Sequence, residues 1–143
     1  MAYTRVNWEN LPSTNTPLNA TNLNKMDAGI ASLYPTAWTN ATLSSGISGG
    51  VKYLKFGNLV LVEIRELYSS SEITASGTII ASGLPSASVP TNFVVSLVTG
   101  STSNDSNCRL RIDNSGNLTL FNDKMYAGSS SLQYYGQVMY LSN

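Results

Sequence analysis

The chain has 143 residues, a formal net charge of zero and only 11% charged residues. A surface this weakly charged has no basic field for nucleic acid or an anionic membrane, so neither is expected as a partner. Histidine is absent, which leaves acid–base catalysis to carboxylates, lysine, tyrosine or the single cysteine. The sequence shows neither an apolar run of membrane-spanning length nor a signal peptide, so we expect synthesis in a cytoplasm without membrane insertion.

Residues 1–18 are expected to form an extended attachment arm. Pro12 has no backbone N–H and biases Leu11 toward extended geometry, so this part of the arm cannot be a regular helix. Trp8 precedes it as an aromatic anchor. The pattern is typical of a segment that lies on another surface.

Residues 19–35 are predicted to form a short helix. Thr16 or Asn19 can cap its start, and Pro17 suits the first helical position if Thr16 is the cap. About fourteen residues of helix are marginal in isolation. Apolar residues recur at alternating steps of three and four, as in a coiled-coil seam: Leu23, Met26, Ile30 and Leu33. The narrow seam favours a self-associating bundle, and a helix resting on its own domain is the alternative.

Four short elements follow one another in the first thirty residues. They are Trp8, the Leu-Pro of 11–12, the Thr-Pro-Leu-Asn-Ala of 16–20 and the Asn-Leu-Asn of 22–24. This ordered string resembles the N-terminal segment of tail-tip and baseplate proteins from tailed phages of Gram-positive bacteria. The resemblance implies that Trp8, Leu11 and Pro12 attach the chain to a phage tail or baseplate protein, and that the chain resides at the virion tail tip.

Residues 36–50 are expected to be a neck or linker with one short strand at 37–43, and residues 51–143 a β head. Strand patterns recur in the head at close spacing without helical periodicity, which is typical of an antiparallel sandwich or barrel. The predicted strands are 51–56, 59–67, 72–75, 77–81, 93–99, 108–112, 118–122 and 131–141. The fold class is therefore mainly β, with an N-terminal arm and helix.

Two strands allow their faces to be assigned. The apolar run 59–62 predicts cover on both faces, with Glu63 and Arg65 on a solvated face beyond it. In the last strand, alternation places Tyr134, Gly136, Val138 and Tyr140 on a core face and Tyr135, Gln137 and Met139 on the other. Cys108 lies in an apolar alternation, which predicts a buried, inert thiol.

Three segments of the head carry a second pattern: residues 51–58, the Leu84-Pro85 to Pro90 connection, and the late hairpin 111–120. Together they look like the C-terminal β domain of phage baseplate and receptor-binding proteins. The chain departs from that pattern at Leu54, where arginine is usual, and at Ser88, where glycine is usual.

Catalytic and metal-binding groups are scarce. Glu63 and Glu66 have odd spacing on one strand, so they point to opposite faces unless a bulge intervenes. The Asp-Asn-Ser-Gly-Asn of 113–117 lacks the bidentate glutamate of a calcium loop and reads as a plain turn. We expect no catalytic residue, no metal ligand, no cofactor and no enzymatic activity.

The composition of the last third of the chain supports a binding role better than a catalytic one. Tyrosines stand among serine, glycine, asparagine and glutamine in the last third, a mixture found in binding loops and suited to saccharides. The candidate saccharide-binding residues are Tyr126, Asp123, Asn122, Tyr135 and Arg109.

The resemblance and composition together imply a homotrimer held to the virion by its N-terminus, with a head that binds host cell-wall polysaccharide. Three copies would turn weak sugar sites into useful avidity. Two alternatives stay open: a structural baseplate or fibre adaptor whose head contacts another tail protein, and a fibre of a tailocin-type particle.

Overall fold

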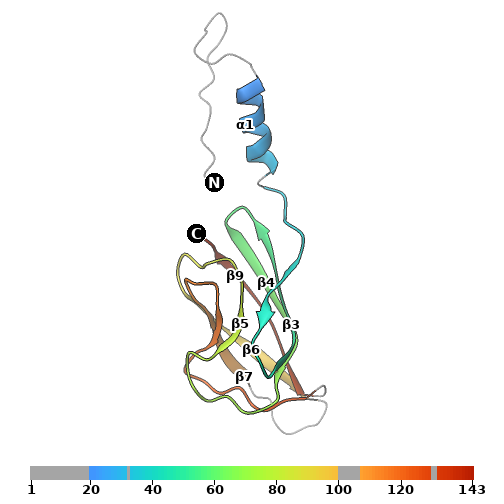
Figure 1. Cartoon of the computed structure of the whole chain (residues 1–143), viewed down its shortest axis with the longest axis vertical. Coiled ribbons are helices and arrows are strands. Elements are labelled where there is room, and N and C mark those ends of the chain that lie inside the picture. Colours follow the sequence, from blue (N-terminus) through green and yellow to red (C-terminus); the bar gives the residue numbers. More distant parts are fainter. Residues whose placement is uncertain (1–19, 32, 100–106, 130–131) are drawn as a thin grey trace, which may run out of the picture. The chain divides into compact units, whose positions relative to one another are not determined.

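The computed structural model describes residues 20–31, 33–99, 107–129 and 132–143 (Figure 1). The chain divides into two units, with the boundary between Pro35 and Thr36. The predicted attachment arm, with Trp8, Leu11 and Pro12, lies outside the described residues.

The first unit contains the helix α1 (Ala20–Ala31), which is shorter than the predicted 19–35. Beyond its end, the Leu33 N–H donates to the Ile30 carbonyl at 2.9 Å, a three-residue turn rather than a helical bond. Pro35 disfavours helical geometry at Tyr34, so a regular helix is not expected to continue to residue 35. Leu33 lies beyond the end of α1, whereas Leu23, Met26 and Ile30 are on the helix, and all four side chains are exposed.

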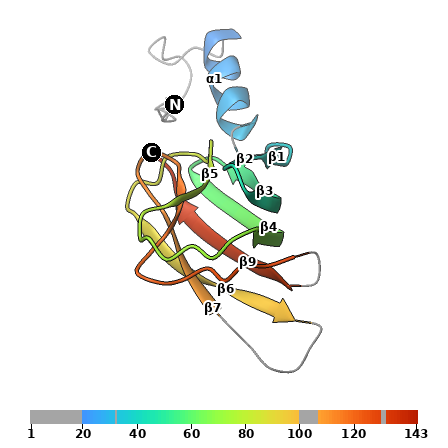
Figure 2. The ribbon, with the colours of Figure 1, turned by 60° about the horizontal axis from the view of Figure 1, so that its bottom comes forward.

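The second unit is an antiparallel β head, as predicted. In the described part of the chain, nine strands form one sheet in the order β1-β3-β4-β9-β6-β7-β8-β5-β2, and Figure 2 shows β3, β4, β9, β6 and β7 in succession. The strands are β1 (Thr39–Asn40), β2 (Thr42–Leu43), β3 (Ile47–Phe56), β4 (Leu59–Ser69), β5 (Ile79–Ser82), β6 (Thr91–Thr99), β7 (Asn107–Ile112), β8 (Leu118–Leu120) and β9 (Leu132–Leu141).

One short segment closes this sheet into a barrel-like shape. Only Ala41 separates β1 from β2, yet β1 pairs with β3 at one end of the sheet and β2 pairs with β5 at the other. Closure is favourable because it leaves fewer unpaired backbone groups at sheet edges. Residues 36–50, which we expected to form a neck, thus supply β1, β2 and the start of β3.

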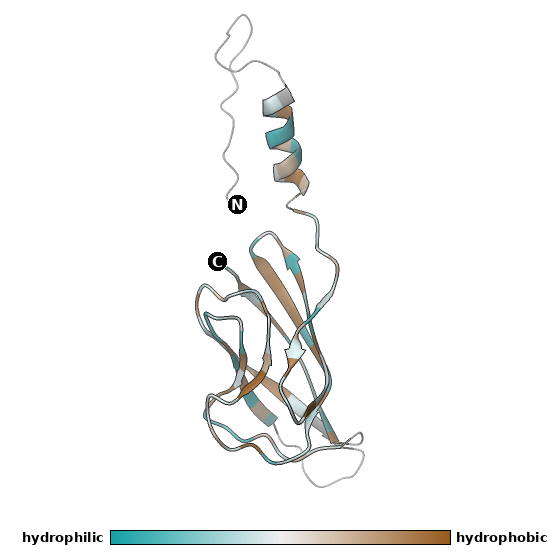
Figure 3. Ribbon diagram, viewed as in Figure 1, coloured by the Kyte–Doolittle hydropathy of each residue, from teal (hydrophilic) through white to brown (hydrophobic). Residues whose placement is uncertain are grey.

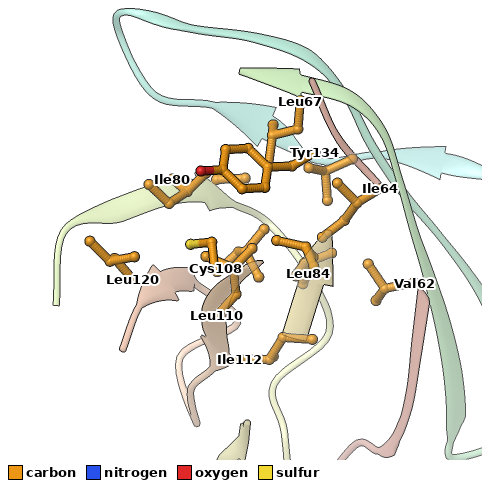
Figure 4. Close-up of a cluster of buried hydrophobic side chains, with 14 of the residues drawn as sticks. Val62, Ile64, Leu67, Ile80, Leu84, Cys108, Leu110, Ile112, Leu120 and Tyr134 are labelled. Atoms are coloured by element: carbon orange, nitrogen blue, oxygen red, sulfur yellow. The ribbon is translucent and has the colours of Figure 1, made fainter. Parts of the chain in front are cut away.

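The core fills the interior of the head. Figure 4 shows Tyr134, Ile64 and Leu110 pointing into the same cluster from β9, β4 and β7. Cys108 is buried, as predicted, and burial raises the pKa of its thiol to about 12, with a smaller contribution from Asp123. An inert thiol follows, because the thiolate is the reactive form.

The predicted alternation of β9 is confirmed. Tyr134 and Tyr140 are buried, whereas Tyr135 and Met139 are exposed. The Tyr140 hydroxyl donates to the Pro85 carbonyl at 2.6 Å. The Tyr134 hydroxyl accepts the Tyr126 N–H at 3.0 Å, and burial raises the pKa of Tyr134 to about 12. Both phenols thus have the partners that buried hydroxyls require.

Strand β4 differs from its prediction at two places. Leu59 is 39% exposed, so the apolar run 59–62, coloured as hydrophobic along β4 in Figure 3, is covered on one face at this end and not on both. Glu63, expected on a solvated face, is buried. Glu63 can be buried because its carboxylate pairs with Lys52 and Arg65.

Candidate functional site

A β-bulge distorts β4 in its second half. Between Ile64 and Leu67 the pairing with β9 shifts, so that two residues, Arg65 and Glu66, stand opposite Tyr135. Glu66 has a φ of 54°, in the left-handed region. From the sequence, Glu63 and Glu66 were expected on opposite faces of the strand unless a bulge lay between them, and this bulge does lie between them. Because an extra residue is inserted, the outer surface of β4 no longer follows simple alternation.

An open hollow of about 560 Å³ lies beside this bulge. Gly136 on β9 forms part of its lining, and a Cβ there would lie 2.7 Å from Cγ1 of Val95. The sheet can therefore accept only glycine at this position without a shift of its neighbours. The lining residues come from β4 and β9: Glu63, Ile64, Arg65, Glu66, Tyr135, Gly136 and Gln137.

An ion cluster forms one side of the hollow. Lys52 Nζ lies 2.9 Å from Glu63 Oε2, and Arg65 Nε lies 2.6 Å from Glu63 Oε1. The hydrogen bond from Lys52, assisted by Arg65, outweighs burial and lowers the pKa of Glu63. With both its oxygens paired, Glu63 is suited to hold the two cations in place. The Arg65 side chain is 65% exposed, so its remaining N–H groups can reach a ligand.

Aromatic rings accompany these charges on the outer surface. Tyr135 is exposed in the hollow, and its hydroxyl donates to Oε1 of Gln133 at 2.8 Å. The Lys52 ammonium lies 4.7 Å from the ring centre of Trp38, which is also exposed. A smaller hollow of about 150 Å³ shares Glu63 and Arg65 with the first. The surface therefore combines ring faces, an amide and a fixed cation.

Three of the predicted site residues gather elsewhere, at the end of the β7–β8 hairpin. The Asp123 carboxylate accepts the Arg109 N–H at 2.7 Å and the Lys124 N–H at 2.8 Å. Asn122 has a φ of 46°, and its N–H donates to the Ser76 hydroxyl at 3.0 Å. These bonds explain Asn122 and Asp123 as turn residues, because short polar side chains stabilise such geometry.

Tyr126 lies next to this group. The Lys124 ammonium is 4.3 Å from the centre of the Tyr126 ring and pairs with Glu72 at 2.9 Å, which raises the pKa of Lys124. One face of the ring is therefore occupied from within the chain. Of the five predicted saccharide-binding residues, only Tyr135 lines the hollow.

Sequence reasoning missed Glu63, Arg65 and Gln137 as residues of this site. The pairing of Glu63 could have been predicted from the sequence. The Gly57-Asn58 turn fixes the register of the β3–β4 hairpin and puts Lys52 opposite Glu63. Cross-strand opposite charges at that point predict an ion pair. The bulge that brings in Arg65 has no comparable signature in the sequence.

Neither a metal site nor a membrane-spanning helix is seen in the parts of the chain that the structure covers. Among those residues, no group of three or more histidine, cysteine, aspartate or glutamate side chains is placed to hold a metal ion. Nor does any helix within the described ranges have the length and apolar character needed to cross a membrane.

No protein-family model and no curated protein matches the chain. Among solved structures, it is similar to the head domain of lactococcal phage bIL170, with a TM-score of 0.55 and 11% identity over 74% of this chain and 97% of that one. It also matches the receptor-binding protein of Listeria phage PSA, with a TM-score of 0.47 and 18% identity over 90% of this chain and 83% of that one. The first similarity confirms the fold of the β head that was expected from the sequence.

Proposed function

We propose that the chain is a receptor-binding protein of a tailed phage of Gram-positive bacteria, and that its head binds a host cell-wall saccharide at the hollow between β4 and β9. The observation that carries the proposal is this hollow, with Tyr135 and Arg65 in its lining. It lies on a fold shared with the bIL170 head domain, which is described as a receptor-binding domain.

The chemistry of the hollow suits a sugar ring. The Tyr135 ring offers an apolar face to the C–H side of a sugar. The Gln137 amide can donate to and accept from hydroxyl groups, and Arg65, fixed through its Nε by Glu63, can donate. A few fixed polar groups around an aromatic surface are what orient a ligand in such a site.

Assembly would make weak single sites effective. Leu23, Met26 and Ile30 form an exposed apolar seam on α1, which supports association of three copies through this helix. Three linked heads gain avidity because binding of the second and third becomes intramolecular. The arm residues Trp8, Leu11 and Pro12 would attach the trimer to a tail or baseplate protein at the tip of the virion.

Binding of the fluorescently labelled full-length chain to Gram-positive cells and to their purified wall polysaccharides tests the site. We expect Tyr135→Ala and Arg65→Ala each to weaken binding about tenfold or more, because each removes a direct contact. Tyr126→Ala is the matched control, since Tyr126 is an exposed tyrosine outside the hollow. The reverse result would place the site at the cluster of Arg109, Asn122 and Asp123.

A structural role as a baseplate or fibre adaptor predicts a different outcome of the same experiment. The wild-type chain would then bind none of the wall polysaccharides but would form a stable complex with another tail protein. A fibre of a tailocin-type particle would use the same head chemistry, and only the particle that carries the chain distinguishes it from a phage protein.

A further inference from the structure

The smaller hollow, of about 150 Å³, lies next to the larger hollow of Tyr135. Its lining comes from β1, β3 and β4, whereas the lining of the larger hollow comes from β4 and β9. Glu63 and Arg65 on β4 line both. The two hollows therefore lie on either side of this pair of side chains.

A row of polar side chains crosses the sheet from one hollow to the other. Its members lie opposite one another on four adjacent strands: Asn40, Lys52, Glu63 and Gln137. Residues that alternate with the row, such as Val51 and Ile64, are buried, so the row belongs to the outer surface. From β1 to β9 it crosses three strand spacings, or about 14 Å.

An exposed aromatic ring stands beside each end of this row. Trp38 is two residues before Asn40, and Tyr135 is two residues before Gln137. The Lys52 ammonium joins Trp38 to the ion cluster, because it lies 4.7 Å from the ring centre and 2.9 Å from Glu63 Oε2. Printed contacts thus run without a break from Trp38 to the ion cluster that lines the larger hollow.

The surroundings of the smaller hollow suit a sugar for the same reasons as those of the larger one. Lys52 covers part of the Trp38 ring, and Trp38 is still 45% exposed, which leaves apolar ring surface for a ligand. The Asn40 amide can donate and accept, and Lys52 has N–H donors beyond the one that pairs with Glu63. A ring, an amide and a fixed cation are present in both hollows.

Gly50 on β3 keeps space open in the smaller hollow. It lines the hollow and pairs with Arg65 across the β3–β4 hairpin. A Cβ at Gly50 would meet only the Arg65 carbonyl oxygen, at the ordinary contact distance of 3.8 Å. The backbone can therefore accept a side chain here, and a bulky one would fill space that a ligand could use.

We propose that the smaller hollow, with Trp38 and Asn40, is a second sugar subsite, and that the ligand of the head is a chain of linked sugar units. The inference rests on the proposed function, because the first subsite is the hollow of Tyr135 and Arg65. The row between them, about 14 Å across, is longer than one sugar ring. A single sugar can therefore fill one subsite, whereas a chain of sugars can fill both.

Fragments of wall polysaccharide of different length test this inference with the full-length chain. Polysaccharide purified from Gram-positive cells is partly hydrolysed and separated into single sugars and short oligosaccharides, and calorimetry measures their affinity. We expect wild type to bind the oligosaccharides at least about tenfold more tightly, because only they reach both subsites. Equal affinity for single sugars and oligosaccharides would contradict a second subsite.

Trp38→Ala should weaken oligosaccharide binding about tenfold and change single-sugar binding less than about twofold. Trp38→Phe keeps an aromatic ring and should retain most of the oligosaccharide affinity. Tyr126→Ala is the matched control, since Tyr126 is also an exposed ring with a lysine ammonium near its centre but lies outside both hollows. Equal loss of single sugars and oligosaccharides in Trp38→Ala would argue against a separate subsite.

Gly50→Ile fills the smaller hollow instead of removing a contact. It should lower the affinity for oligosaccharides to that for single sugars and leave single-sugar binding unchanged. β-Branched side chains suit a strand, and a thermal midpoint close to that of wild type would establish that the head is folded. Unchanged oligosaccharide binding in this folded variant would overturn the inference.

The outcomes separate this inference from the proposed function. Sugar binding that Tyr135→Ala weakens, but neither Trp38→Ala nor Gly50→Ile affects, would remove the second subsite and leave the first. A wild-type chain that binds neither polysaccharide nor fragments would overturn both. If Trp38→Ala dissociates the assembly in light scattering and leaves oligosaccharide binding unchanged, Trp38 is a contact between copies and the inference is wrong.

Discussion

The head and the helix differ in how far their apolar side chains are buried. In the head, strands far apart in sequence surround Leu110, Ile64 and Tyr134, which are all fully buried within one chain. On α1, Leu23 and Ile30 repeat at seam spacing and remain exposed. The head therefore contains its own hydrophobic stabilisation, whereas the helix exposes apolar side chains at the spacing of a helical contact.

This difference indicates that the two units are stabilised in different ways. A closed sheet with a filled interior can present a fixed hollow, because its strands and ion cluster are held from within. A helix of twelve residues is marginal by itself and gains stability from packing against other helices. Changes in the two units should therefore affect different measurements, and the following predictions use that separation.

The largest effect is expected at the helical seam. Leu23→Asp combined with Ile30→Asp should convert the assembly to monomers at micromolar concentration, because charges replace two apolar contacts between copies. The thermal midpoint of head unfolding should change little. Light scattering measures the first result and calorimetry the second. Asn24→Asp, an exposed position off the seam, should leave assembly intact.

In the core, Leu110→Ala should lower the free energy of unfolding by about 3 kcal/mol, the usual cost of removing a fully buried leucine. Denaturant unfolding of the head measures it. Val94→Ala, at an exposed position on the neighbouring strand, should change the free energy by less than about 0.5 kcal/mol. Similar losses in both variants would contradict the assigned core.

The lining of the hollow gives an intermediate effect. Gly136→Ala should cost about 1–3 kcal/mol, because the new methyl group meets the Val95 side chain at 2.7 Å. Val95→Ala creates space at the same point. A double-mutant cycle should therefore show favourable coupling between the two substitutions, and additive losses would argue against this close approach.

The smallest effect is expected from acid. Partial burial favours the neutral form of Asp113, but N–H donors of Asn117 and Ser115 outweigh it and lower the pKa of Asp113 from its ordinary 3.8. A lowered carboxyl pKa stabilises the fold above 3.8, and this contribution is lost as the pH falls through the folded value. Below pH 4 the thermal midpoint of wild type should fall more steeply than that of Asp113→Asn.

Several features of the head could be predicted because they depend on neighbours in sequence. The alternation from Tyr134 to Tyr140 assigned the faces of β9 correctly, since successive side chains of a strand point to opposite sides. The turn at Gly57-Asn58 fixed the β3–β4 hairpin for the same local reason. The spacing of Leu23, Met26 and Ile30 predicted α1.

The candidate site was only partly predictable. Tyr135 was predicted to bind saccharide from the composition of its segment and its outward-facing position on the strand, and it does line the hollow. Arg109, Asn122 and Asp123 were predicted from composition alone. The hydrogen bonds of Asn122 and Asp123 stabilise a turn, in which only the backbone N–H of Arg109 takes part. Glu63 was assigned to a solvated face because the sequence does not show that Lys52 and Arg65 meet its carboxylate.

The sequence by itself determined the mainly β class, the faces of β9, the hairpins and the heptad seam, because each follows from periods and turns a few residues long. Tertiary structure alone decided that β1 and β2 pair with opposite ends of the sheet, and that a hollow lies beside the bulge at Arg65 and Glu66. These features depend on pairings between strands distant in sequence, where no local pattern fixes which partner a strand will meet.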